Sequence, residues 1–230
     1  MYIIFSFICA VAPAVFLVVY YYKQDKAKPE PKGLIVKIFI IGIFSTIIAV
    51  ILELLISLLA PLVKIDLLFY FFNAFVVAGF SEELIKLLVV LFFVFKNVEF
   101  DKVVDGIVYT VVASLGFACF ENIMYVLKGG LSTAIIRAFT SIPLHALASG
   151  IMGFYIGKAK FDVVNRAKII IKGLFIAILI HGYYDFVIFA IPSLGILPAL
   201  SIIPLLIWMF FHLKRKIKES SVLDQEAGRV

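Results

Sequence analysis

The stretch GFSEELIKLL, residues 79–88, places two adjacent carboxylates and a lysine inside a run that is otherwise apolar from Leu67 to Phe95. A helix needs about 20 apolar residues to cross a hydrocarbon core of about 30 Å, and this run is long enough. The whole chain has the same character, with 64% hydrophobic and 16% charged residues and a mean hydropathy of +1.15. These values lie outside the range of soluble domains and predict an integral membrane protein.

Apolar runs of similar length recur along the whole chain. They predict an all-α, polytopic transmembrane helical bundle of about seven helices. The expected spans are roughly 2–22, 34–60, 67–95, 103–128, 131–157, 169–191 and 194–213. We expect one transmembrane domain over residues 1–213, followed by a short cytoplasmic tail over 214–230 that is disordered after Lys218.

The distribution of lysine and arginine predicts the orientation of these spans. Four basic residues lie in the 23–33 loop, two in 96–102, five in 158–172 and four just after the last span, whereas the opposite loops hold only Lys64 and Lys128. Positive charge is retained on the cytoplasmic side of a membrane. With seven spans, the N-terminus is expected outside and the C-terminus inside. The net charge of +6 then reflects topology, and no nucleic-acid partner is expected.

Charges within a span are costly, because a charged side chain at the bilayer centre costs about 2.5–3.5 kcal/mol on insertion scales. Lys86 follows Glu82 by four residues and Glu83 by three, so it can reach either carboxylate along one helix face. One lysine cannot neutralise two glutamates, and close carboxylates in a low dielectric favour acid and base chemistry. A polar clamp between helices is the structural alternative.

Further polar residues fall deep within the later spans. Glu121 has no basic partner on its own helix face, and His145 follows Pro143 near the middle of the expected fifth span. His181 and Asp185 are four residues apart and share a helix face. Each alone is compatible with a hydrogen bond between helices, but together they predict a site facing the bundle interior.

Two charged residues outside this set have simpler interpretations. Arg137 either extends toward the outer interface or balances Glu121. Asp105 borders the fourth span, where helix capping is expected.

Four motifs occur in order: EELIK at 82–86, FACFEN at 117–122, IPLHALASGIMGFYIG at 142–157 and HGYYD at 181–185. With these motifs the chain resembles the PrsW family over most of its length. Members of that family are bacterial intramembrane proteases that cleave anti-sigma factors. The family is similar to the superfamily of CAAX prenyl endopeptidases and bacteriocin-processing proteins. The resemblance implies a multi-pass protein of the bacterial plasma membrane, a membrane protein substrate such as an anti-sigma factor, and no cofactor or metal.

The resemblance also implies roles for the polar residues. Glu82 is expected to activate water, with the other groups supporting it: Glu83, Lys86, Glu121, and the pair His181 and Asp185. Glu121 stands where prenyl endopeptidases have histidine, and Asp185 where they have asparagine. An ionised aspartate cannot donate a hydrogen bond, so Asp185 is expected to orient His181, with His145 as a second donor.

The expected chemistry is the attack of water on a peptide carbonyl inside the membrane. A carboxylate removes a proton from water, and histidines stabilise the negative oxygen that develops. Within the expected topology Glu82 and His145 lie near the midplane, while Glu121 and Asp185 lie outward of it. A water-filled cleft open to the outer side and cleavage near the outer membrane boundary are therefore expected.

Three other interpretations remain open from the sequence. Intramembrane Glu, His and Asp residues also form the relays of proton-coupled or cation transporters, although no inverted repeat is visible. A non-catalytic membrane scaffold would retain the polar cluster to hold its helices together. A metal-dependent protease is a variant of the glutamate-dependent one, because these carboxylates and imidazoles are suitable ligands for Zn²⁺ or Mn²⁺.

Overall fold

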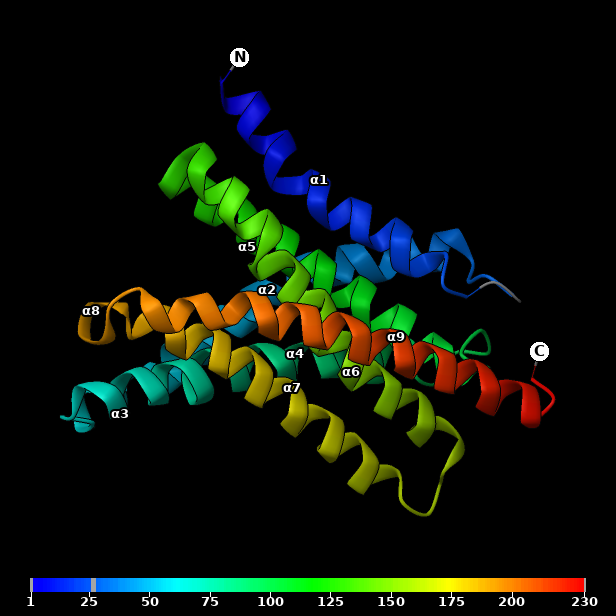
Figure 1. The fold of residues 1–230 in the computed structure, drawn as a ribbon. Helices are drawn as coiled ribbons and strands as arrows, with labels where there is room; N and C mark the ends of the chain where they lie inside the picture. Colours follow the sequence, from blue (N-terminus) through cyan, green and yellow to red (C-terminus); the bar gives the residue numbers. More distant parts are fainter. Residues whose placement is uncertain (1, 26–27, 230) are drawn as a thin grey trace.

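The computed structural model describes residues 2–25 and 28–229, with side chains from Phe7 onward, and Lys26 of the first basic loop lies outside this range. Every regular element in the described part of the chain is helical (Figure 1). The α-helices are α1 (Tyr2–Tyr22), α2 (Lys32–Ser57), α3 (Asp66–Phe71), α4 (Phe80–Phe93), α5 (Val103–Phe139), α6 (Ser141–Phe161), α7 (Arg166–Phe189), α8 (Ile191–Leu194) and α9 (Ile202–Glu226). Short 3₁₀ turns form η1 (Ala60–Leu62) and η3 (Leu197–Ser201), and a π-helix forms η2 (Phe72–Gly79).

The described part of the chain crosses the bundle seven times, which confirms the predicted all-α, polytopic architecture. Four helical stretches in it are long and apolar enough to span a membrane: Lys32–Leu62, Val103–Phe161, Arg166–Phe189 and Leu197–Glu226. The second of these contains two passes. The remaining passes are α1 and the continuous stretch formed by α3, η2 and α4. The protein is therefore a multi-pass membrane protein.

Contacts between distant segments show which connections share an end of the bundle. At one end, Lys102 contacts Asp25 across 2.6 Å, and Asp224 near the C-terminus accepts hydrogen bonds from the backbone N–H groups of Val103 and Val104. At the other end, the hydroxyl groups of Tyr184 and Thr140 lie 3.1 Å apart. The N-terminus and C-terminus thus lie at opposite ends, as an odd number of passes requires (Figure 1).

The chain reverses direction at Gly130, which confirms the predicted start of the fifth span. This span was expected over 131–157; residues 131–139 carry the label α5, but they follow the kink and run back beside the first part of that helix into α6, which ends at Phe161. Gly130 has φ of 69°, a left-handed conformation that glycine adopts without steric cost. His145 lies four residues after the start of α6, near the middle of the returning pass over residues 131–161, as predicted.

The prediction of a disordered tail after Lys218 is wrong. Helix α9 continues to Glu226, where the sequence suggested an end near 213. The buried carboxylate of Asp224 explains this order, because it accepts hydrogen bonds from the first N–H groups of α5. Those groups have no partner within their own helix, and a negative charge at a helix N-terminus is favourable.

Close helix packing at glycines positions the site. A Cβ at Gly106 of α5 would lie 2.4 Å from the Gly153 oxygen of α6, and one at Gly157 would lie 2.1 Å from the Val103 oxygen. Small residues of this kind let membrane helices approach closely. A similar approach joins Gly79, at the end of η2, to Gly182 of α7. These contacts bring α4, α5, α6 and α7 together around the depth at which their polar side chains meet.

Candidate active site

Glu83 is the centre of the polar cluster and is completely buried. Its carboxylate accepts hydrogen bonds from Lys86 Nζ at 2.8 Å and from Ser149 Oγ at 3.0 Å, and it lies 2.9 Å from His181 Nδ1. These partners come from α4, α6 and α7. A buried carboxylate with three donors is a satisfied structural anion, so Glu83 joins three helices.

Glu82, its neighbour in sequence, has a different environment. Its only hydrogen bond within the described residues comes from Lys86 Nζ, at 3.1 Å from Oε2, and the same oxygen lies 3.7 Å from His181 Nε2. Glu82 also lines a cavity that Glu83 does not reach. Of the two adjacent glutamates, Glu82 is the one whose carboxylate faces open space.

His145 is held at both ring nitrogens. Nδ1 lies 2.9 Å from Lys86 Nζ and Nε2 lies 3.0 Å from Glu121 Oε2. A lysine ammonium has three donors and no acceptor, so Nδ1 accepts its hydrogen bond and Nε2–H donates to Glu121. The interaction with Lys86 therefore sets the tautomer of His145.

His181 has one engaged nitrogen and one facing other acids. Nδ1–H donates to Glu83, whereas Nε2 lies 3.4 Å from Asp185 Oδ2 and 3.7 Å from Glu82 Oε2. The histidine is packed edge to face against His145, with 4.9 Å between ring centroids. The nitrogen of His181 next to Glu82 and Asp185 is thus the freer one.

Arg137 was expected either to extend toward the outer interface or to balance Glu121, and its contacts decide between these two interpretations. The guanidinium Nη2 lies 3.0 Å from Glu121 Oε2, and Nε donates to the Asn122 side chain at 3.0 Å. The kink at Gly130 allows this contact, because it turns the chain back so that Arg137 meets residues of the preceding part of α5. Arg137 balances Glu121 and does not extend to the interface.

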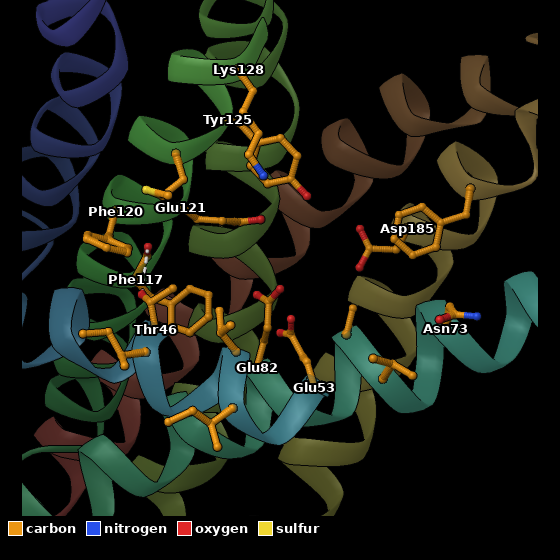
Figure 2. Close-up of a pocket in the computed structure, with 17 residues that line it drawn as sticks. Thr46, Glu53, Asn73, Glu82, Phe117, Phe120, Glu121, Tyr125, Lys128 and Asp185 are labelled. Carbon is orange, nitrogen blue, oxygen red and sulfur yellow. Dashed lines mark hydrogen bonds between the residues drawn. The ribbon is translucent and has the colours of Figure 1, made fainter. Parts of the chain in front are cut away.

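A cavity of about 620 Å³ joins these groups to the exterior (Figure 2). Figure 2 shows the carboxyl groups of Glu82, Glu121 and Asp185 pointing into it from α4, α5 and α7. Glu53 of α2 and Asn73 of η2 line the same cavity, and sequence reasoning missed both. The signal for Glu53 was available, because it is the single carboxylate within the predicted 34–60 span.

The structure brings all seven predicted site residues into one connected cluster. They are Glu82, Glu83, Lys86, Glu121, His145, His181 and Asp185. Ser149 is an additional member that sequence reasoning did not single out. Nothing in its sequence neighbourhood distinguishes it from a serine that packs between helices.

Three residues of this cluster also have the type and spacing of ligands for a divalent metal ion. One potential ligand atom from each of Glu82, His145 and His181 lies within 4.8 Å of the others. Two imidazoles and a carboxylate form a common ligand set of hydrolytic zinc, and Glu83 on His181 resembles the carboxylate that orients such a histidine. Lys86 contacts two of the three groups, so a bound dication would share them with an ammonium.

Comparisons with known proteins agree with this arrangement. A family model described as PrsW family intramembrane metalloprotease matches residues 30–211. Protease PrsW of Geobacillus kaustophilus is 36% identical over 221 residues, covering 94% of this chain and 92% of that protein. Protease PrsW of Bacillus subtilis is 31% identical over 219 residues, covering 91% and 93%.

Protease PrsW of Clostridioides difficile is 34% identical over 188 residues, covering 79% of this chain and 78% of that protein. No solved structure matches the chain. The family match spans most of the chain and includes all four helices that carry the polar cluster. The chain therefore belongs to the PrsW family of intramembrane proteases.

Proposed function

We propose that this protein is an endopeptidase that cleaves a single-span membrane protein near its outer membrane boundary, with Glu82 as the base that activates water. The observation that carries this proposal is the difference between the two adjacent glutamates. Glu83 is saturated by three donors, whereas Glu82 lines the cavity where a water molecule and a peptide have access. A base must reach the proton that it removes.

The contacts of Glu82 support its role as a base. Lys86 is its hydrogen-bond donor at 3.1 Å, and the same ammonium also contacts Glu83. Because one cation is shared between two carboxylates, Glu82 is only partly compensated and keeps an oxygen available to a water proton. As the O–H bond of water breaks, its oxygen attacks the carbonyl carbon and its proton moves to Glu82.

The hydrogen-bond partners of the two histidines support one of them as the oxyanion donor. Both nitrogens of His145 are engaged, by Lys86 and by Glu121, so this histidine has no free N–H for a substrate oxygen. His181 Nε2 is directed toward Asp185 and Glu82 at the cavity. His181, oriented through Glu83 and Asp185 and carrying a proton on both ring nitrogens, is therefore the proposed donor to the developing oxyanion through Nε2–H, and His145 positions Lys86 and Glu121.

A metal-assisted version of the same hydrolysis is the second candidate, and the spacing of Glu82, His145 and His181 favours it. These three residues would hold the ion, which supplies Lewis-acid chemistry when bound and lowers the pKa of its water. Glu83 would then orient His181 as a ligand. Glu121 and Arg137 would keep their mutual ion pair in either case.

We expect cleavage to continue at an undiminished rate after treatment with a metal chelator, because Lys86 already supplies positive charge to Glu82 and His145. The measurement is the initial rate of the purified protein before and after prolonged chelation, with a metal analysis of the same sample. Complete inhibition by the chelator that added Zn²⁺ reverses would replace the glutamate mechanism with the metal-assisted one.

The depth of the lining residues supports a cleft that opens toward the end carrying the N-terminus. Glu82 lies 11 residues before Phe93, where α4 ends on the predicted inner side, so it is near mid-helix depth. Glu53 lies only four residues before Ser57, where α2 ends on the predicted outer side. Asp185 likewise lies four residues before the end of α7 at Phe189. At 1.5 Å per residue, the cavity extends from mid-helix toward the predicted outer ends.

We expect cysteines at the cavity rim, Met124→Cys and Phe189→Cys, to react with a membrane-impermeant thiol reagent added to intact cells. Phe95→Cys and Ile170→Cys, near the opposite end, are expected to react only after the membrane is permeabilised. The background is a variant in which the two native cysteines are replaced by alanine. A C-terminal reporter should be cytoplasmic. Reaction of the rim cysteines from the cytoplasmic side alone would refute the outward-opening cleft.

The substrate is proposed from the family resemblance to be an anti-sigma factor with one transmembrane helix. The test is incubation of the purified protein with candidate single-span substrates, followed by measurement of the fragment masses. The masses locate the cleaved bond, which we expect near the outer end of the substrate helix because the proposed cleft opens on that side. Cleavage near the cytoplasmic boundary would contradict this geometry.

A further inference from the structure

The cluster contains more negative than positive groups. Its two permanent cations, Lys86 and Arg137, accompany five carboxyl groups, those of Glu53, Glu82, Glu83, Glu121 and Asp185. Lys128 also lines the cavity, but it forms no ion pair with any of the five in the described part of the chain. Even two positively charged histidines would leave one carboxylate without a paired charge. A charge excess of this kind is costly in a low dielectric and favours the binding of a further cation.

Contacts identify Glu53 as the uncompensated group. Glu83 has Lys86, Glu121 has Arg137, Glu82 shares Lys86, and Asp185 lies beside His181. Within residues 2–25 and 28–229, the Glu53 carboxyl makes neither a hydrogen bond nor an ion pair. The charged groups that act most strongly on it include three acids, Glu82, Glu121 and Asp185, together with His181.

Glu53 also lies at a position where a substrate would pass. In Figure 2 the carboxyl group of Glu53, on α2, points into the cavity beside that of Glu82. Glu53 is four residues from the end of α2, and Asn73 of η2 lines the same cavity. If the scissile peptide bond of a substrate is held at Glu82, the substrate chain would therefore pass Glu53 between that bond and the rim of the cavity.

We propose that Glu53 is a specificity-determining residue that binds a lysine or arginine side chain of the substrate, on the outer side of the scissile bond. This inference rests on the proposed function and names the class of substrate that the site prefers. A long basic side chain has an apolar stem that suits the apolar lining and a terminal charge that reaches the lone carboxylate. Binding such a residue would compensate the excess charge of the cavity.

The test uses one single-span substrate that the wild type cleaves, made in versions that differ at each of the first few positions outward of the cleaved bond. Each position carries Lys, Leu or Glu, and kcat and KM are measured for every version. At one of these positions the wild type is expected to prefer Lys over Leu on the order of 10- to 100-fold in kcat/KM, mainly through KM.

Glu53→Gln should reduce this preference to near unity, and Glu53→Lys should invert it in favour of Glu. Glu99→Gln is the matched control, because Glu99 lies in the loop after α4 and outside the cavity, and it should keep the wild-type preference. Size-exclusion chromatography of each variant in detergent checks folding. If Glu53→Lys does not fold, the ratio of kcat/KM for the Lys and Leu substrates, measured with Glu53→Gln, still tests whether Glu53 determines the preference.

Several outcomes overturn the inference and leave the protease proposal intact. These are the absence of a Lys preference in the wild type, a preference that persists in Glu53→Gln, and an equal loss for Lys and Leu substrates, each with cleavage that still requires Glu82. An equal loss for Lys and Leu substrates would mean that Glu53 contributes to cleavage regardless of the substrate side chain, as expected if its carboxyl group only transfers a proton in the reaction. Cleavage that is unaffected by Glu82→Gln would instead overturn the proposed function.

Discussion

Glu82→Gln is expected to lower kcat/KM for substrate cleavage by about 10²- to 10⁴-fold, the range typical of a lost general base. Glutamine keeps the shape of the side chain and still accepts a hydrogen bond from Lys86, which lies 3.1 Å from Oε2. It cannot remove a proton from water at neutral pH. Because the side chain faces the cavity, the protein is expected to insert and fold as the wild type does.

The measurement is the appearance of fragments of defined mass over time, with wild type and variant at equal amounts of folded protein. Glu99→Gln, outside the cavity, serves as the control for a change of charge alone. Equal cleavage by the wild type and Glu82→Gln would exclude Glu82 as the base. Comparison with Glu83→Gln separates the two glutamates, because that change leaves three buried donors without their full acceptor and should also destabilise the fold.

Lys86→Met is expected to have the largest effect on stability, with a loss of about 3–5 kcal/mol in the free energy of unfolding together with loss of cleavage. The Lys86 ammonium is completely buried and lies within 3.1 Å of Glu82, Glu83 and His145 Nδ1. Methionine fills the volume of the stem and removes the charge. Two adjacent carboxylates then remain in the bundle interior without their shared cation.

Thermal unfolding in detergent, followed by the loss of helical signal, measures this effect. Lys158→Met is the control, because Lys158 forms a partly exposed ion pair at 3.8 Å from Glu219, and such pairs contribute about 0–1 kcal/mol. The double variant Lys86→Met with Glu83→Gln should lose less than the sum of the single changes, because the ion pair is then removed as a unit. An unfolding temperature of Lys86→Met equal to that of the wild type would contradict the central role of this cation.

Local sequence patterns were sufficient to find most of the site. Lys86 reaches Glu82 and Glu83 because residues three and four apart are neighbours on a helix, and the same spacing brings Asp185 to 3.4 Å from His181. The cost of charge in a membrane then indicated that these groups face one another across helices. Glu53 shows the weakness of this reasoning, since a lone carboxylate between apolar residues has no local partner that reveals its role.

Taken by itself, the sequence determined the membrane class, the seven passes and the helix face on which each polar residue lies, because hydropathy and helical periodicity are local properties of the chain. Tertiary structure decided how the acids differ from one another. The three donors on Glu83, the tautomer of His145 and the pairing of Arg137 with Glu121 all depend on contacts between α4, α5, α6 and α7. Such contacts follow from close packing at glycines and from the kink at Gly130, whose geometry is set by the whole bundle and not by neighbouring residues.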